Sequence, residues 1–320
     1  MTVPRIVVTG KIPEPGVEVL KTIGEVWAWT DDEPIPHDIR DEQLATADAV
    51  VTLLTDTVDE AFLDAAPQLK IVANVAVGYN NIDVGLCQVR GVTVTNTPGV
   101  LTDATADLAM TLMLMLCRRA GEGERELRAG AWAGWRPTHL VGQAMTGKTL
   151  GIIGMGRIGK AVAQRAHFGF GMEIGCFNRS PVADGAGVGA TQYDSVAALC
   201  AASDFVSLHC AATPDTFEIL NEEALAAMSA DAYVINTARG DVVDETALVA
   251  ALESGAIAGA GLDVFQGEPA VNPAILAAPN TVLLPHLGSA TRETRVAMGL
   301  KVVANARAFA AGEPLPDPVG

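Results

Sequence analysis

A glycine-rich turn near the middle of the chain constrains the fold more than any other feature. The apolar stretch Thr149–Ile153 leads directly into Gly154-Met155-Gly156-Arg157-Ile158-Gly159, and Ile158, Val162 and Ala166 then recur at helical spacing. A G-x-G-x-x-G turn between a strand and a helix lets the backbone turn tightly, approach a pyrophosphate and pack the helix on the strand. The helix start also offers free N–H groups and a partial positive charge. The sequence therefore predicts a βα unit that binds the phosphates of a dinucleotide.

Short apolar runs alternate with helix-like segments on both sides of this turn. The predicted strands before it are Arg5–Thr9, Ala49–Leu54, Lys70–Ala76 and Val92–Asn96, and the predicted helices are Gly16–Ile23, Glu60–Ala65, Ile82–Val89 and Ala104–Arg119. Strands from the turn onward are predicted at Thr149–Gly154, Met172–Phe177, Phe205–Leu208, Ala232–Asn236, Gly259–Asp263 and Thr281–Leu284. The later helices are predicted at Gly156–His167, Ser195–Ala202, Asn221–Ala227, Glu245–Ser254 and Thr291–Ala311.

Such alternation is typical of βαβ units and parallel sheets buried on both faces. We expect an α/β protein with two doubly wound parallel-sheet domains, Rossmann-like or flavodoxin-like, and a cleft between them. The predicted NAD(P)-binding domain spans residues 98–288. The predicted substrate domain combines residues 1–97 with the returning segment 289–320.

Composition excludes several classes of protein. The chain has 320 residues with a formal net charge of −17 and no run of Lys or Arg, which argues against a nucleic-acid partner. The most apolar helix, Ala104–Cys117, is too short to cross a bilayer. The five scattered cysteines form no C-x-x-C pair, so we expect free thiols and neither a disulfide framework nor a metal site. Because the start MTVPRIVVTG lacks the pattern of a signal peptide, we expect a cytoplasmic location.

The residue that ends the second strand of the nucleotide domain predicts which dinucleotide binds. NAD-binding domains usually place Asp or Glu there, about 20 residues after the glycine turn, to hold the ribose 2′-hydroxyl. This chain instead has Asn178, Arg179 and Ser180, and Asn178 lies 19 residues after Gly159. Asn178 does not repel a 2′-phosphate, Arg179 can pair with it and Ser180 can donate to it. We therefore expect NADP(H) to be preferred over NAD(H), unless Arg179 is an ordinary exposed arginine.

Three later loops each follow a predicted strand and carry one charged or titratable residue: Arg239, Glu268 and His286. The loops at the carboxyl ends of a doubly wound sheet line the crevice that holds the cofactor. Carbonyl reduction needs a proton donor for the developing oxyanion, and a histidine is suited to this near neutral pH. Glu268 would orient His286, and Arg239 can bind a 2-oxo acid and polarise its carbonyl. Each residue alone also has an ordinary structural explanation. Because all three occur at successive strand ends, that explanation is weaker for the set than for each residue.

Other strand-end residues are weaker candidates for the cofactor site. We include Cys210, Thr237, Ala238, Asp263 and Gly288 among the expected cofactor-binding residues because they stand in the same loops. Asp263 can face the nicotinamide amide or cap a loop. His209 and Cys210 can border the adenosine or pack in the core.

The whole chain resembles the D-isomer-specific 2-hydroxyacid dehydrogenase family. The motifs that carry the resemblance are the glycine turn, the three charged loops, Val75-Ala76-Val77-Gly78-Tyr79-Asn80-Asn81-Ile82-Asp83 and the run NTPGVLTDATAD at 96–107. That run and the stretch Trp132…Gly134-Trp135-Arg136-Pro137 are most similar to glyoxylate/hydroxypyruvate reductases within the family.

The resemblance implies roles that the residue pattern alone does not. It implies that the N–H groups of Val77 and Gly78 hold the substrate carboxylate, that Leu53 borders the substrate and that Thr102 lies near the nicotinamide. It further implies a homodimer in which Trp135 reaches the site of the partner chain. Burial of Trp132 and Trp135 as simple anchors is the alternative. Ala211-Ala212-Thr213 departs from the Pro-Leu-Thr of many relatives and weakens the adenosine-side assignment.

The expected function is reduction of a small 2-oxo acid, glyoxylate or hydroxypyruvate, to the D-2-hydroxy acid by NADPH, with His286 as proton donor. A phosphoglycerate-type dehydrogenase is an alternative, but the loop 74–80 has no Lys or Arg for a phosphate. A phosphite-type enzyme carries Lys where Val77 stands. A non-catalytic NAD(P)H-sensing binding protein would retain all three charged residues. Turnover of a 2-oxo acid distinguishes an enzyme from this last class.

Overall fold

The computed structural model of the chain describes residues 3–182 and 186–320. Backbone contacts divide the chain into two units, residues 1–101 with 289–320 (unit 1) and residues 102–288 (unit 2). The first boundary was predicted four residues earlier, at 97/98. It lies at Leu101/Thr102 because Thr102 begins a long helix that packs in unit 2.

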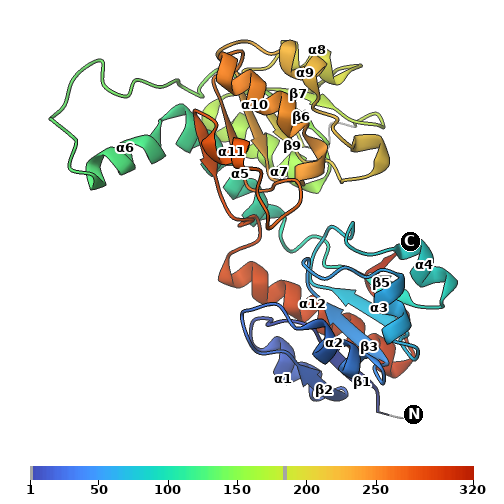
Figure 1. Cartoon of the computed structure of the whole chain (residues 1–320). Helices are drawn as coiled ribbons and strands as arrows, with labels where there is room; N and C mark the ends of the chain where they lie inside the picture. Colours follow the sequence, from blue (N-terminus) through green and yellow to red (C-terminus); the bar gives the residue numbers. More distant parts are fainter. Residues whose placement is uncertain (1–2, 183–185) are drawn as a thin grey trace. The chain divides into compact units, whose positions relative to one another are not determined.

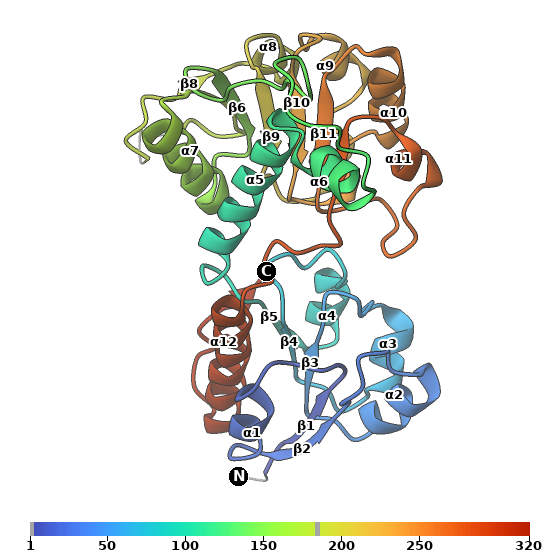
Figure 2. The ribbon, with the colours of Figure 1, turned by 90° about the vertical axis from the view of Figure 1, so that its left-hand side faces the viewer.

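Unit 1 is built on a six-stranded sheet of order β13-β5-β4-β3-β1-β2. Its strands are β1 (Arg5–Val8), β2 (Glu25–Ala28), β3 (Ala49–Thr52), β4 (Ile71–Asn74), β5 (Thr93–Thr95) and β13 (Pro318–Val319). Its helices are α1 (Gly16–Leu20), α2 (His37–Leu44), α3 (Glu60–Ala65), α4 (Val84–Val89) and α12 (Arg292–Ala311). Figure 2 shows α1 and α12 on one face of the sheet and α2, α3 and α4 on the other. The central strands β3 and β4 are buried throughout, as expected of a sheet covered on both faces.

Unit 2 is built on a seven-stranded sheet of order β12-β11-β10-β9-β6-β7-β8, and every pair in it is parallel. Its strands are β6 (Thr149–Ile153), β7 (Glu173–Phe177), β8 (Thr191–Gln192), β9 (Phe205–Leu208), β10 (Tyr233–Asn236), β11 (Gly259–Leu262) and β12 (Thr281–Leu283). Its helices are α5 (Thr102–Cys117), α6 (Ala120–Arg128), α7 (Arg157–Phe170), α8 (Val196–Ala201), α9 (Glu222–Ala226), α10 (Glu245–Ser254) and α11 (Pro273–Ala277). Two short 3₁₀ turns, η1 (Pro214–Thr216) and η2 (Gly240–Val242), complete it (Figure 1).

The strand order of unit 2 places the glycine turn at a reversal of the sheet. β6 pairs with β7 on one side and with β9 on the other, so the chain adds strands in both directions from β6. Ligands of doubly wound sheets bind at such a switch point, outside the carboxyl ends of the strands. Residues 154–159 follow β6 at this point, which confirms the predicted fold class for this unit.

Local capping explains where many of the helices begin and end. A side-chain oxygen of the N-cap residue accepts a backbone N–H at the start of seven helices. These N-cap residues are Asp59, Asp83, Ser195, Asn221, Asp244, Asn272 and Thr291. Three helices end at a glycine with positive φ, namely Gly171, Gly255 and Gly312. These residue types mark boundaries in the sequence, and the helices predicted there lie within a few residues of those observed.

One edge of the sheet of unit 1 departs from the parallel arrangement. β13 pairs with β5 in the antiparallel direction. The cause is a polar tether, because Asp317 accepts hydrogen bonds from Lys301 Nζ at 2.7 Å and Asn305 Nδ2 at 3.1 Å. The Asn305 side chain in turn accepts the Asp317 N–H. The tether holds the last residues against α12 and along the sheet edge.

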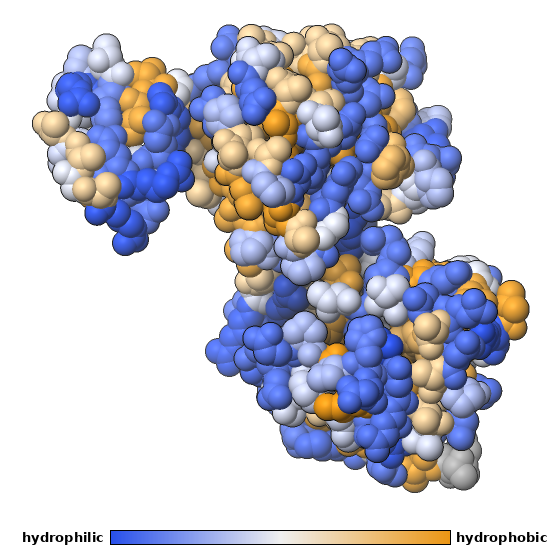
Figure 3. All heavy atoms as spheres, in the orientation of Figure 1, coloured by the Kyte–Doolittle hydropathy of each residue, from blue (hydrophilic) through white to orange (hydrophobic). Residues whose placement is uncertain are grey.

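Residues 120–144, here called the arm, project from the body of unit 2 (Figure 1). Its helix α6 has no buried residue. Leu127, Trp132, Trp135 and Val141 are 62%, 53%, 80% and 62% exposed, and Figure 3 shows apolar surface on the arm among hydrophilic residues. Across residues 3–182 and 186–320, no helix combines the length and apolar character needed to cross a membrane.

Candidate active site at the strand ends of unit 2

The three glycines of the turn each have a distinct steric environment. Gly154 has φ +96°, and a Cβ built on it would lie 2.6 Å from the Cys210 nitrogen. A Cβ on Gly159 would lie 2.3 Å from the Gly154 carbonyl oxygen, so the helix packs against the turn too closely for a side chain. A Cβ on Gly156 meets nothing within 4 Å. The first and third glycines therefore shape the protein, and the second leaves open space.

That open space suits the pyrophosphate of a dinucleotide. Gly156 is the N-cap of α7 and has no side chain to satisfy the first N–H groups of the helix. Arg157, the first helical residue, is exposed. Unpaired N–H groups, the helix dipole and a guanidinium together favour an anionic group at this end.

The Asn178 amide binds the glycine turn itself. Its Oδ1 accepts the Met155 N–H at 3.2 Å and its Nδ2 donates to the Ser180 carbonyl at 2.9 Å. Arg179 and Ser180 are exposed beside it. Within the described residues Arg179 has no ion pair, so its charge faces solvent next to the turn.

The loop after β9 packs against the turn, and the loop after β10 contacts His209. His209 lies 2.8 Å from Ser207 Oγ and 3.5 Å from Thr237 Oγ1, and burial lowers its pKa to about 3, so it is neutral. Burial raises the pKa of the Cys210 thiol to about 11. His209 is thus a neutral, buried side chain, and Cys210 is a protonated thiol beside the glycine turn. Ala238 is held by the Asn236 side chain, whose Oδ1 accepts its N–H at 2.9 Å.

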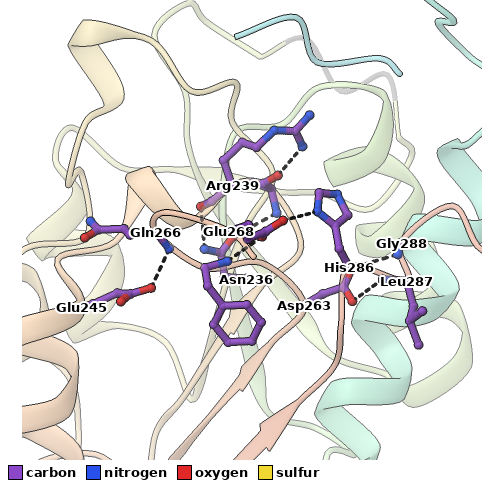
Figure 4. Close-up of polar contacts among 11 residues, drawn as sticks. Asn236, Arg239, Glu245, Asp263, Gln266, Glu268, His286, Leu287 and Gly288 are labelled. Carbon is purple, nitrogen blue, oxygen red and sulfur yellow. Dashed lines mark hydrogen bonds and ion pairs between the residues drawn. The ribbon is translucent and has the colours of Figure 1, made fainter. Parts of the chain in front are cut away.

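His286 and Glu268 form a close pair (Figure 4). His286 Nδ1 and Glu268 Oε2 are 2.7 Å apart, and the other oxygen of Glu268 accepts the Phe265 N–H at 2.8 Å. The two side chains keep 28% and 31% of their exposure. Burial favours the neutral form of Glu268, but His286, the Phe265 N–H and the charge of Arg239 outweigh it, so the pKa of Glu268 is lowered. Glu268 is thus a fixed carboxylate that orients the imidazole.

Arg239 lies close to this pair in Figure 4. Its Nη1 donates to the Ala238 carbonyl at 2.7 Å, and its own carbonyl accepts from Asn236 Nδ2 at 2.8 Å. Burial lowers the pKa of Arg239, whereas the charges of Glu268 and Asp241 act in the opposite direction. A guanidinium stays protonated after such a shift, so a cation, a carboxylate and an imidazole share one part of unit 2.

The backbone at His286 is held in an uncommon conformation, with φ +55°. The buried Asp263 carboxylate accepts the N–H groups of Leu287 at 2.6 Å and Gly288 at 2.8 Å, and its carbonyl accepts the His286 N–H at 2.9 Å. Burial raises the pKa of Asp263, and these two N–H groups oppose the rise. Asp263 therefore caps the loop that carries His286.

Thr105 and Glu245 support the catalytic loops, and no motif in the sequence marks either residue. Thr105 of α5 donates to the Gly288 carbonyl at 3.1 Å, which ties the His286 loop to a helix three residues after Thr102. The buried Glu245 accepts the Gln266 N–H at 2.8 Å, and Gln266 Nε2 donates to the Val243 carbonyl at 2.9 Å (Figure 4).

The loops of Arg239 and Glu268 also touch directly. A Cβ on Gly240 would lie 1.9 Å from the carbonyl carbon of Phe265, so only glycine allows this approach. The contact and the Glu245–Gln266 hydrogen bond fix the spacing of the two loops.

Three predicted substrate residues belong to unit 1. Leu53 follows β3, and its N–H donates to Asp56 Oδ2 at 2.7 Å. Val77 and Gly78 are half-buried in the loop after β4. Trp135 lies on the exposed arm of unit 2, so its alternative interpretation as a buried anchor, shared with Trp132, is wrong.

Comparisons with known proteins identify the family that the sequence motifs resemble. Residues 110–288 match the family model described as D-isomer specific 2-hydroxyacid dehydrogenase, NAD binding domain. The glyoxylate reductase of Thermococcus litoralis is 46% identical over 314 residues, covering 97% of this chain and 95% of that protein. The chain belongs to the D-isomer-specific 2-hydroxyacid dehydrogenases. Its unit 2 is the NAD-binding domain of this family.

Solved structures of other 2-hydroxyacid dehydrogenases have the same fold. An NADPH-dependent glyoxylate/hydroxypyruvate reductase from Sinorhizobium meliloti, in complex with NADP and malonate, is 37% identical with a TM-score of 0.88, covering 100% of this chain and 97% of that one. A glyoxylate reductase from Paecilomyes thermophila is 35% identical with a TM-score of 0.88, covering 100% and 99%. No group of three potential metal ligands was found among the described residues of this dehydrogenase.

Proposed function

We propose that this protein reduces a small 2-oxo acid, glyoxylate or hydroxypyruvate, to the D-2-hydroxy acid with NADPH. The observation that carries the proposal is the His286–Glu268 pair at 2.7 Å, beside Arg239 and in the domain with the glycine turn. The substrate assignment is supported by relatives of 42–46% identity that are named glyoxylate reductases.

The glycine turn and its neighbours would hold the cofactor. The residues assigned to this role are Thr102, Gly154, Met155, Gly156, Arg157, Ile158, Gly159, Asn178, Arg179, Ser180, Cys210, Thr237, Ala238, Asp263 and Gly288. When bound, the reduced nicotinamide supplies the hydride.

The chain's own residues supply the proton and hold the substrate. With Nδ1 engaged by Glu268, His286 presents Nε2 as the proton donor for the substrate oxygen. Ionised Glu268 keeps the ring in this orientation. The Arg239 guanidinium binds the oxo acid and stabilises negative charge on its oxygen. The N–H groups of Val77 and Gly78 hold the carboxylate, and Leu53 borders the substrate.

The preference for NADPH is supported by the end of β7. The place of the usual acidic residue is taken by Asn178, followed by the exposed Arg179 and Ser180. A 2′-phosphate gains a cation here and meets no carboxylate from these three residues. The NADP complex of the S. meliloti reductase is consistent with this assignment.

We also assign a homodimer and a cytoplasmic location. The exposed apolar residues of the arm support a partner chain, with Trp135 contributed to the partner's site. All five cysteines are free, which suits a reducing compartment.

The decisive experiment mixes the protein with NADPH and glyoxylate and follows loss of the absorbance of the reduced nicotinamide. We expect turnover with glyoxylate and hydroxypyruvate, little with phosphohydroxypyruvate, no oxidation of phosphite by NADP⁺, and a lower kcat/KM with NADH. His286→Ala is expected to lower kcat by about 10²- to 10⁴-fold, the usual contribution of a general acid. Absence of turnover on every 2-oxo acid would favour an NAD(P)H-sensing binding protein, and a preference for NADH would refute the cofactor assignment.

A further inference from the structure

The loop after β4, residues 75–79, has all of its carbonyl groups from residue 76 onward engaged inside unit 1. The four hydrogen bonds are Thr97 N–H to Ala76 at 2.9 Å, Asn96 Nδ2 to Val77 at 2.7 Å, Asn74 Nδ2 to Gly78 at 3.0 Å and Ile82 N–H to Tyr79 at 3.0 Å. Two of the four donors are asparagine side chains from the ends of adjacent strands.

The backbone N–H groups of the same four residues, 76–79, have no hydrogen-bond partner among the described residues. Nearly all buried backbone N–H groups in proteins have a partner, and Ala76 is only 6% exposed. A run of unpaired N–H groups opposite fully engaged carbonyls is the arrangement that binds an anion.

Both asparagines make a further hydrogen bond within unit 1. Asn74 is fully buried, and its Oδ1 accepts from Thr52 Oγ1 at 3.2 Å, which directs its Nδ2 toward Gly78. Asn96 is half-buried at the end of β5, and its backbone N–H donates to the Asp317 carbonyl at 3.3 Å. Each side chain donates to one carbonyl of the loop, and Thr52 fixes the orientation of the Asn74 amide.

We propose that Asn74 and Asn96 are positioning residues that hold this loop with its N–H groups available to the substrate carboxylate. The inference rests on the proposed function and deepens it. The loop 74–80 has no basic side chain, so within this loop the N–H dipoles are the groups that would bind the anion.

The test uses oxalate, a carboxylate that cannot be reduced, titrated into the enzyme saturated with NADPH. For Asn96→Ala we expect the Kd of oxalate and the KM of glyoxylate to rise about 10- to 100-fold, the range for hydrogen bonds to a charged group. The Kd of NADPH is expected to be unchanged, because the cofactor residues belong to unit 2. Asn96→Asp, which has the same shape but no donor, is expected to be at least as impaired.

Thr95→Val is the matched control. It changes the neighbouring buried residue and removes a 3.5 Å bond to the Val72 carbonyl without touching the loop. We expect wild-type oxalate binding from it. An Asn96→Ala enzyme with unchanged oxalate Kd, or an impaired Thr95→Val enzyme, would overturn the proposal, as would a wild type that does not bind oxalate.

These outcomes are separable from failure of the proposed function. A wild type whose oxalate binding depends on Asn96, but which does not reduce glyoxylate, would refute the proposed activity. The positioning role of Asn96 would still hold. Asn74 is fully buried, and replacing it would disturb the core of unit 1. The test therefore substitutes the half-buried Asn96.

Discussion

Glu268 shows how one side chain links catalysis to stability. One of its oxygens contacts His286 at 2.7 Å and the other accepts the Phe265 N–H. Its pKa is lowered from the usual 4.5, because these partners and Arg239 outweigh the effect of burial. A carboxyl group of this kind stabilises the fold above its unfolded pKa, and the contribution is lost as pH falls through the folded pKa.

We therefore expect Glu268→Gln to be less stable than the wild type at neutral pH, with a difference that shrinks below about pH 4.5. The measurement is the thermal unfolding midpoint of both proteins across a series of pH values. Asp38→Asn, on the exposed start of α2, serves as a control and is expected to show little difference at any pH. A Glu268→Gln deficit that stays constant into the acidic range would contradict the prediction.

The sequence predicts candidate residues better than it predicts their supports. Arg239, Glu268 and His286 could be selected because each follows a strand and bears a group suited to carbonyl reduction. Asn74, Asn96 and the Glu245–Gln266 contact could not, because a side chain that binds a distant backbone group leaves no spacing in the sequence.

At the scale of elements, the glycines of the turn between β6 and α7 have two different roles. One leaves space for a ligand, and the others allow close packing of the protein. Gly156 has φ −80° and ψ −158°, which alanine also adopts, and open space beyond it. Gly159 has no room for a side chain, because a Cβ built on it would lie 2.3 Å from the Gly154 carbonyl oxygen.

We expect Gly156→Ala to fold normally and to raise the Kd of NADPH by about tenfold or more, because a methyl group would occupy the site of closest approach to the pyrophosphate. Gly159→Ala is instead expected to lose about 1–3 kcal/mol of stability through overpacking. Thermal unfolding and fluorescence titration with NADPH measure the two effects. Equal behaviour of the two variants would count against the assigned roles.

Helix α10 supports the catalytic loops through its first residue, Glu245. Glu245→Ala is expected to lower kcat about 10- to 100-fold by letting the Glu268 loop shift. Glu245→Gln keeps an oxygen that can accept the Gln266 N–H, so we expect activity within about threefold of the wild type. If both variants lose activity equally, the hydrogen bond does not position the loop.

Most elements could be predicted because apolar periodicity and capping residues define them locally. The prediction omitted β2, α2, α6, α11 and the two-residue strands β8 and β13. Helix α6 has the sequence AGEGERELR, with one large apolar residue and therefore no apolar stripe to detect. β13 contains a proline and exists because the Asp317 tether holds it beside β5, which is a tertiary effect.

At the scale of the whole molecule, the arm offers an apolar surface that a second copy would cover. We expect the wild type to sediment as a dimer and Leu127→Asp to shift it toward monomer, because burying an unpaired carboxylate is costly. Val89→Asp places the same charge on an exposed aliphatic residue of α4 and is expected to leave the dimer intact. Analytical ultracentrifugation decides the matter, and a monomeric wild type would refute the assignment.

Unit 1 is discontinuous in sequence, and this has a consequence for synthesis on the ribosome. Unit 2 is continuous over residues 102–288, so all of it emerges before the segment 289–320 that completes unit 1. The first hundred residues must therefore wait, without α12 against β4 and without the edge strand β13, until the segment 289–320 has been synthesised. A chain that stopped before this segment would have a finished nucleotide domain, whereas its first domain would expose an unpaired sheet edge, a template for aggregation.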